Sequence, residues 1–440
     1  MKNLLKYFYF AISIFLYGFI AFYLQRTDFV SLVISFAILF FCYYKLVVDC
    51  KENIWFLIIS TIAFRLVFGW VLPNLSQDFY RFIWDGRLVA QGLNPYIYLP
   101  KNIIFDAGFH LRQAKELFAG MGSLSAEHFS NYPPINQLFF AIAGLFAGNS
   151  IVGSVVVLRL IIITADLGTL YFGQKLLKNL GLNSNRIFWY LLNPLVVLEL
   201  SGNLHFEGVM LFFVVFSMYL LQRNFLKWSA LVLAISISIK LLPILLLPIF
   251  YKYLGFKKAL VFYSIIIIAN ILFIAPFFST EFINNYSSTI GLWFTNFEFN
   301  ASIYYVIRAV GFHFYGYNLI HTTGKIIPVL VVLFILYKSF FTENRTEINL
   351  FNSFLIVLSF YCFTATTVHP WYVINLVLIS VFTKYKFPLV WSFFIILSYF
   401  AYSVFPFEEN LGMIFIEYIL VFTVLIYEII YKPITVKSEN

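Results

Sequence analysis

Asp78 is the carboxylate in this sequence best placed for acid–base chemistry. It lies in segment 76–100, where polar, charged and aromatic residues directly follow a long apolar run. Burial against the neighbouring Phe79, Phe82 and Trp84 would raise the pKa of its carboxyl group toward the range of a useful general base. The structural alternative is that Asp78 caps a short helix at a membrane surface.

Asp85 follows Asp78 by seven residues, which places both on one face if the segment is helical. Arg81 and Arg87 stand beside these carboxylates, and guanidinium groups are well suited to binding anionic groups. An ion pair with either arginine, or a turn at the following glycine, explains Asp85 as well as catalysis does. We therefore treat Asp85, Arg81 and Arg87 as candidate substrate-binding residues around a catalytic Asp78.

His205 and Glu207 form a second polar pair, two residues apart in an otherwise apolar stretch. A divalent ion is compatible with such a pair, but two ligands do not complete a metal site, and no third ligand stands at a suitable spacing. We therefore predict no metal and no other cofactor. Binding of sugar hydroxyl groups, or capping of a helix, is the expected role of the pair.

Lys240 lies in an apolar segment that also contains Pro243 and Pro248. A lysine at the centre of a membrane helix costs about 2.5–3.5 kcal/mol on insertion scales, so an anionic partner is expected. The prolines permit a broken helix whose backbone lines a cavity, and a phosphate is the natural ligand there. Snorkelling of Lys240 to the membrane surface is the alternative.

Arg65 raises the same question within an earlier apolar run, and we include it as a second candidate for binding phosphate. Arg159 and Asp166 lie seven residues apart in a later run. Because that spacing can put both side chains on one helix face, we expect an internal ion pair between them without a role in function.

Four aromatic or imidazole side chains complete the predicted substrate-binding set. They are Tyr132, which precedes two prolines, and His369, Trp371 and Tyr372 of the sequence His-Pro-Trp-Tyr. The turn at Tyr132 is rigid, and such turns more often shape a loop than contact substrate. For His369, an anchor at the membrane interface and a headgroup contact are equal alternatives, and tyrosine and tryptophan are also enriched at that interface.

The composition places these residues in a membrane protein. Hydrophobic residues make up 62% of the 440 residues and charged residues 11%, and the mean hydropathy is +0.88. Such a chain has too little polar surface for a soluble globule of this size. The net charge of +9 is expected on cytoplasmic loops, so no nucleic-acid partner is predicted. The three cysteines form neither a disulfide framework nor a ligand cluster.

Apolar runs predict an all-α, polytopic transmembrane protein with about 12–14 membrane segments in a single domain, 1–440. The runs cover 5–24, 30–49, 54–73, 151–171, 187–202, 206–222, 259–278, 318–341, 350–366, 372–383, 387–405 and 411–431. Two further stretches are ambiguous by length. We expect 135–147 to lie at the outer interface and 228–254 to cross outward and return as a broken pair.

Lysine and arginine set the orientation, because they stay on cytoplasmic loops. An inward N-terminus puts most basic residues inside and leaves only Arg26 and Arg308 in the short outer loops. The long loop 74–134 then lies outside the membrane and carries the catalytic face. The expected location is a cell membrane, with the active site on its extracytoplasmic face.

The polar motifs, taken in order, carry a family resemblance. Asp78-Phe79-Tyr80-Arg81, Trp84-Asp85-Gly86-Arg87 and Gly92-Leu93-Asn94-Pro95-Tyr96 resemble the first outer loop of GT-C type integral-membrane glycosyltransferases, especially bacterial polyprenol-phosphate-mannose-dependent mannosyltransferases. The similarity continues through the motifs that begin at Tyr132, Gly202, Lys240 and His369.

The resemblance implies a multi-span helical fold and transfer of a sugar, expected to be mannose, with inversion. The implied partners are a polyprenyl-phosphate sugar donor, membrane lipid, and a glycan or lipid-linked acceptor. By the same analogy Asp78 is the general base, and Lys240 or Arg65 binds the donor phosphate. A transporter of lipid-linked glycans and a polymerase or ligase of surface glycans remain the alternatives.

Overall fold

The computed structural model describes residues 2–431, so residue 1 and residues 432–440 of the predicted domain lie outside the described range. Within residues 2–431 the chain is helical, and its β-structure is an isolated bridge between Phe299 and Thr367. The all-α prediction is confirmed. A membrane favours this outcome, because an α-helix satisfies its backbone hydrogen bonds within its own segment.

The helices follow one another along the chain with short connections. Their bounds are α1 Lys2–Phe22, α2 Phe29–Asp49, α3 Ile54–Leu66, α4 Asp78–Ala90, α5 Pro100–Ile103, α6 Ala114–Ala126, α7 Pro134–Ala147, α8 Ile151–Asn179, η1 Ser184–Ile187, α9 Phe188–Leu191, α10 Pro194–Val196, η2 Val197–Gly202, α11 Glu207–Gln222, α12 Leu226–Ile237, η3 Leu242–Ile249, α13 Phe250–Ile274, η4 Ala275–Phe277, α14 Thr280–Thr295, α15 Ile303–Tyr315, α16 Ile320–Phe341, α17 Glu347–Thr364, α18 Pro370–Val381, α19 Phe387–Phe394, η5 Ile395–Tyr402 and α20 Leu411–Tyr431.

Seven helices in the described range are long and apolar enough to cross a membrane, or eight if the bent pair 194–202 and 207–222 counts as one span. Five shorter apolar helices accompany them: Ile54–Leu66, Pro134–Ala147, Leu226–Ile237, Pro370–Val381 and Phe387–Tyr402. The prediction of a polytopic membrane protein is confirmed. Fewer full-length helices occur than the 12–14 predicted segments, because several of those segments are short or broken.

The chain reverses direction at Gly255, inside α13. Gly255 has φ +70° and ψ 163°, which no helix contains. The Tyr263 hydroxyl donates to the Leu247 carbonyl at 2.9 Å across 16 residues, whereas a continuous helix would separate these residues by about 24 Å. Two antiparallel legs therefore meet at Gly255. This reversal separates the segment 228–254 from the apolar run 259–278 that follows it.

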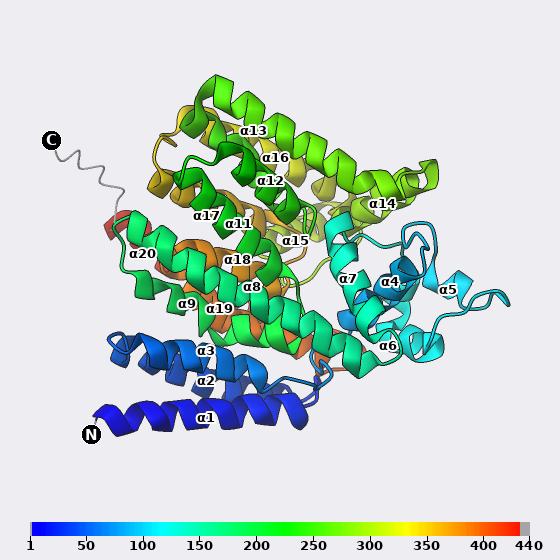
Figure 1. The fold of residues 1–440 in the computed structure, drawn as a ribbon, viewed down its shortest axis with the longest axis horizontal. Helices are drawn as coiled ribbons and strands as arrows, with labels where there is room; N and C mark the ends of the chain where they lie inside the picture. The colour runs from blue at the N-terminus through cyan, green and yellow to red at the C-terminus, as the bar shows by residue number, and fades with distance from the viewer. Residues whose placement is uncertain (1, 432–440) are drawn as a thin grey trace.

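The linkers predicted to be cytoplasmic contact one another at one end of the bundle. The Asn185 amide donates to the Lys51 carbonyl at 2.6 Å, and the Lys252 ammonium donates to the Thr342 carbonyl at 3.0 Å. In Figure 1, α1 begins and α20 ends at this same end. The chain therefore crosses the bundle an even number of times between the start of α1 and the end of α20.

The predicted outer segments gather at the opposite end, around α4 to α7 (Figure 1). The Asn94 amide donates to the Phe277 carbonyl at 2.9 Å, and the Asn285 amide donates to the Tyr96 carbonyl at 3.0 Å. Helix α7 also stays at this end, since the Ile135 N–H donates to Ser238 at 3.0 Å and the chain then enters α8 directly. Its placement agrees with an interfacial, non-crossing helix.

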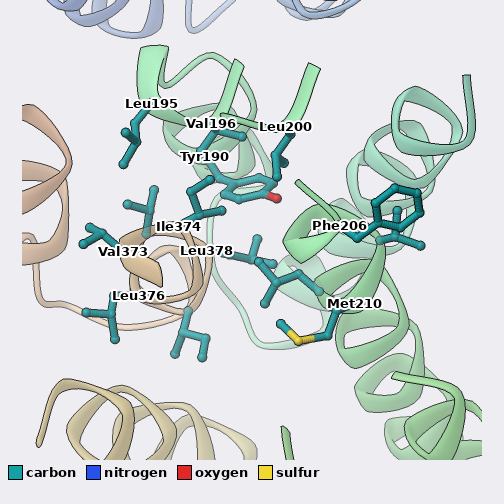
Figure 2. Packing of buried hydrophobic residues seen from close by; sticks show 14 of the residues in the cluster. Tyr190, Leu195, Val196, Leu200, Phe206, Met210, Val373, Ile374, Leu376 and Leu378 are labelled. Atoms are coloured by element: carbon teal, nitrogen blue, oxygen red, sulfur yellow. The ribbon is translucent and has the colours of Figure 1, made fainter. Parts of the chain in front are cut away.

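The core behind this end is built from broken helices packed on α18. Figure 2 shows Tyr190, Leu195 and Val196 on one side and Val373 and Ile374 of α18 on the other. All five side chains are fully buried. Burial of so many large apolar groups holds the breaks at residues 192–206 in place, which fixes the start of α11 near the outer segments.

Helices α4 and α7 cross at Gly86 and Gly144 with their backbones in contact. A Cβ on Gly86 would lie 2.1 Å from the Phe140 carbonyl oxygen, and one on Gly144 would lie 2.7 Å from the Gly86 carbonyl oxygen. No side chain fits at such a crossing without moving a helix. The position of α4, and of Asp78 at its start, therefore depends on this contact.

We predict that Gly86→Ala destabilises the protein by about 1–3 kcal/mol or more, because the added methyl group separates α4 from α7. The matched control is Gly291→Ala, since a Cβ at Gly291 in α14 meets nothing within 4 Å. Thermal unfolding in detergent compares the two variants with the parent protein. Equal melting temperatures for all three proteins would contradict the close crossing.

Candidate active site

A cavity of about 780 Å³ opens at the end of the bundle where the predicted outer segments gather. The start of α4, the loop before α7, the start of α11, the turn after α12 and the segment before α18 all contribute to its walls. Of the residues predicted from sequence, it brings together Asp78, Arg81, Tyr132, Glu207, Lys240, His369, Trp371 and Tyr372. The residues Arg65, Asp85, Arg87 and His205 do not line it.

Asp78 is the first residue of α4 and lines the cavity. Within residues 2–431, no side chain or backbone group hydrogen-bonds to its carboxylate, and the N-cap position belongs to Gln77. Capping of the helix therefore does not account for Asp78. Burial raises the pKa of its carboxyl group above the usual value, while Lys240 and then Arg26 act in the opposite direction. A partly desolvated carboxylate with free lone pairs is suited to accepting a proton.

Lys240 lies in the turn between α12 and η3, where the helix ends. Its ammonium group forms an ion pair with Glu207, the first residue of α11, and 23% of the lysine side chain remains exposed to the cavity. The second carboxylate oxygen of Glu207 is buried without a partner. Glu207 thus offsets the cost of placing Lys240 at this depth and holds the ammonium group toward the cavity.

Arg26 also lines the cavity, and the sequence reasoning did not include it in the site. Its guanidinium carbon lies 3.3 Å from the centroid of the Tyr402 ring, a cation–π contact. No carboxylate in the described chain pairs with it, and its Nε atom is buried without a partner. The sequence held one indication of this role: Arg26 is one of two basic residues in the short predicted outer loops.

Arg81 and Asp85 form the ion pair that was the alternative explanation for Asp85. The Arg81 Nε atom donates to the Asp85 carboxylate at 2.7 Å, and Ser130 donates to the same carboxylate at 2.6 Å. Arg81 also donates to the Ser125 and His128 carbonyls at 2.6 and 2.9 Å. Asp85 is buried and positions Arg81, which in turn fixes one wall of the cavity.

Arg87 and Arg65 lie away from the cavity. Arg87 donates to the Arg112 carbonyl and to the Gln113 side chain, within the outer loop. The Arg65 Nε atom lies 2.6 Å from the Asp166 carboxylate, with both side chains fully buried. This placement leaves Lys240, rather than Arg65, as the candidate for binding phosphate.

The prediction of an ion pair between Arg159 and Asp166 is wrong. Arg159 instead donates to the carbonyls of Ser201 at 2.6 Å and Gly69 at 2.8 Å, while Asp166 takes Arg65 from α3. Seven residues rise about 10.5 Å along a helix, so two side chains on one face still lie two turns apart. Partners on neighbouring helices are closer than partners on α8 itself.

Four rings form a continuous stack beside the cavity. His369 lies 4.9 Å from Phe299 and 4.3 Å from Trp371, and Trp371 lies 3.8 Å from His205, all between ring centroids. His205 is therefore behind the cavity wall, next to the buried Glu199 at 3.5 Å. Burial, followed by Arg26 and Lys240, lowers the pKa of His369 to about 3, so its imidazole is neutral at physiological pH.

Tyr132 and Tyr372 complete the aromatic part of the wall. The Tyr132 ring packs edge-on against Phe82 with centroids 5.1 Å apart, and the Tyr372 ring lies edge-on to His369 at 5.7 Å. Both rings are held by neighbours inside the protein rather than by a membrane surface. They are therefore placed to contact a ligand in the cavity.

One flank of the cavity is apolar and runs toward the exposed side of the helix bundle. Leu242 and Leu245 of η3 line it on one side, and Ile327, Val331 and Val332 of α16 line it on the other. Val332 is also one of the exposed apolar side chains of α16. The cavity thus connects a charged pocket to a surface whose exposed side chains are apolar, as is typical of surfaces that face lipid. In the described range, no group of three or more His, Cys, Asp or Glu side chains is arranged to hold a metal ion.

The family model described as "Alpha-(1->6)-mannopyranosyltransferase, N-terminal domain" matches residues 21–254. The chain belongs to this family. The match contains Asp78, Glu207 and Lys240 and ends before the stacked rings of His369 and Trp371. The resemblance expected from the sequence motifs is confirmed, and the mannopyranosyltransferase-family region holds the charged half of the cavity.

Two curated relatives are similar to part of the chain. Alpha-(1->6)-mannopyranosyltransferase A of Mycobacterium tuberculosis is 23% identical over 215 residues, which cover 47% of this chain and 40% of the relative. Alpha-(1->6)-mannopyranosyltransferase B of Corynebacterium glutamicum is 25% identical over 174 residues, which cover 38% of this chain and 28% of the relative. The chain thus matches less than half the length of either relative.

We predict that the Asp78 carboxyl group titrates above pH 3.8, its ordinary value, because burial disfavours the carboxylate. Infrared difference spectroscopy follows the carboxyl C=O band, and the Asp78→Asn variant assigns it. The Lys240→Met variant shifts the midpoint further upward, since the ammonium group favours the ionised form. A midpoint at or below the ordinary value would contradict the buried position.

Proposed function

We propose that this protein transfers a mannosyl group from a polyprenyl-phosphate donor to a hydroxyl group of an extracytoplasmic glycan or lipid-linked acceptor. Membership of the mannopyranosyltransferase family supports the mannosyltransferase activity and favours transfer over transport. The observation that carries the proposal is the pairing in one cavity of an unpartnered carboxylate, Asp78, with two cations, Lys240 and Arg26.

The cavity suits a donor that is anionic at one end and hydrocarbon along its length. Lys240 and Arg26 supply positive charge for a phosphate, and Arg26 has no competing carboxylate within residues 2–431. The leucines of η3 and the apolar residues of α16 supply the flank for a prenyl chain. Removal of that chain from water favours binding in proportion to the apolar area covered.

The chemical step is a single displacement with inversion at the sugar C1 atom. Asp78 accepts the proton of the acceptor hydroxyl as its oxygen forms the new bond to C1. The bond between C1 and the phosphate oxygen breaks, and its electron pair leaves with the polyprenyl phosphate. Lys240 and Arg26 stabilise the negative charge that develops on the phosphate. Fixed cations in a partly dry cavity are effective in this role because they need no reorganisation.

Glu207 and the ring stack position the reacting groups. Glu207 holds the Lys240 ammonium at the edge of the cavity, so the cation is present before donor arrives. The neutral His369 and the neighbouring Trp371 offer a flat, weakly polar wall, and aromatic faces suit the apolar side of a sugar ring. The basic linkers lie at the far end of the bundle from this cavity, which supports an extracytoplasmic site.

Asp78→Asn is expected to lower kcat by about 10²–10⁴-fold, the usual contribution of a general base, with donor affinity retained. The assay uses purified protein, radiolabelled polyprenyl-phosphate mannose and an alkyl mannoside acceptor. The matched control is Asp49→Asn, an exposed aspartate at the other end of the bundle. Full activity of the Asp78→Asn protein would end the assignment of Asp78 as base.

Lys240→Met is expected to raise the donor Kd by about tenfold or more, since hydrogen bonds to charged groups contribute about 1.5–3 kcal/mol. Because this change also leaves Glu207 buried and unpaired, the Lys240→Met/Glu207→Gln double variant is measured beside it. Lys115→Met, an exposed lysine of α6, is the control. An unchanged donor Kd in the double variant would show that Lys240 does not bind the phosphate.

A further inference from the structure

A second, smaller depression lies on the outer loop next to the catalytic cavity. Its volume is about 260 Å³, and its walls include Tyr98, Asn102, Asp106 and Phe129. Phe129 also lines the larger cavity. The two spaces therefore adjoin at Phe129, which is part of the wall of each.

We propose that this depression is a subsite for a neutral glycan acceptor, binding a sugar residue beyond the hydroxyl that receives the mannosyl group. The proposal rests on the proposed function, because it assigns the acceptor's position relative to Asp78. An acceptor that fills both spaces then contains at least two sugar residues. It also predicts that longer acceptors bind more tightly than a single sugar.

The wall formed by Phe129 is rigid, because the chain is held on both sides of it. On one side Arg81 donates to the Ser125 and His128 carbonyls at 2.6 and 2.9 Å. On the other side the Ser130 hydroxyl donates to Asp85 at 2.6 Å. The Arg81–Asp85 pair, which the catalytic helix α4 carries, therefore sets the position of the ring between the two spaces.

The opposite wall is held from the bundle. The Tyr96 hydroxyl donates to the Tyr132 carbonyl at 2.6 Å, and the Asn285 amide of α14 donates to the Tyr96 carbonyl at 3.0 Å. Tyr98 follows two residues later. Both walls are thus fixed before a ligand arrives, which reduces the ordering cost of binding.

The chemistry of the depression matches a sugar ring, which has apolar C–H faces and a polar rim. Phe129 and Tyr98 offer aromatic faces, with Ile103 beside them. Among residues 2–431, the Tyr98 hydroxyl and the Asn102 amide make no side-chain hydrogen bond. Asp106 uses one carboxylate oxygen to accept from the Gly108 N–H at 2.9 Å. These groups remain available to hydroxyl groups.

Charge and location favour a neutral glycan over an anionic lipid headgroup. The residues that line the depression include a carboxylate, Asp106, and no lysine or arginine. The adjacent Lys101 is engaged with Glu127 at 3.4 Å on the surface. In Figure 1, α5 lies at the extreme outer end of the molecule, beyond the ends of the long helices. An anion there would be repelled by the Asp106 carboxylate.

The test compares acceptors of different length on the full-length protein. The Tyr98→Ala/Asn102→Ala variant and the parent are assayed with octyl mannoside and with an octyl trimannoside. We expect the KM for the trimannoside to rise about tenfold in the variant, while kcat and the KM for the monosaccharide stay unchanged. Unchanged monosaccharide kinetics show that the variant is folded, and Lys115→Ala is the matched surface control.

A binding measurement tests the subsite independently of the proposed transferase activity. In the Asp78→Asn background, saturation-transfer NMR measures trimannoside binding with and without the Tyr98→Ala/Asn102→Ala change. Loss of trimannoside binding in the changed protein supports the subsite, even if the parent protein transfers to neither acceptor and the proposed function fails. Equal trimannoside binding, or a KM change of the same size for both acceptors, would overturn it.

Discussion

The cost of burying charge in an apolar bundle organises this structure. Three buried arginines show how charge is compensated here: Arg65 pairs with Asp166 of another helix, Arg81 with Asp85 of its own helix, and Arg159 with backbone carbonyls. A buried charge without such a partner is strongly unfavourable, so these pairings are explained by the stability of the fold. Asp78 and Arg26 differ from these residues because, within residues 2–431, the charged group of neither makes a hydrogen bond or ion pair, and both line the same cavity.

Broken helices make that cavity possible. The chain leaves regular α-helix at 192–206, at 238–241 and before α18, and each break presents polar residues at the outer end of the bundle. In a bilayer, irregular backbone is tolerated only where protein or a water-filled cavity satisfies its polar groups. The breaks therefore bring Glu207, Lys240 and His369 to the site, while the apolar core shown in Figure 2 holds them in register.

Arg81 links three parts of the site through one guanidinium group. It pairs with Asp85, lines the cavity one helical turn after Asp78, and holds the carbonyls on one side of Phe129. Asp78, the proposed proton acceptor, and the proposed glycan subsite are thus positioned by the same helix. The crossing of α4 with α7 at Gly86 fixes that helix against the bundle, so a packing contact about two turns from Asp78 decides the geometry of both spaces.

The sequence by itself determined the membrane class, the helical fold, the polar segment that contains Asp78 and, of the twelve candidate site residues, the eight that line the cavity. It could do so because hydropathy, prolines and lone charges in apolar runs act locally along the chain. It also identified the alternative role of Asp85, since a pair four residues apart lies within one helix. Only the tertiary structure decided that Asp166 takes Arg65, that His205 lies behind Trp371, and that Arg26 enters the site. Those outcomes depend on which helices pack together, and contacts between segments more than a hundred residues apart leave no periodic signal in a single sequence.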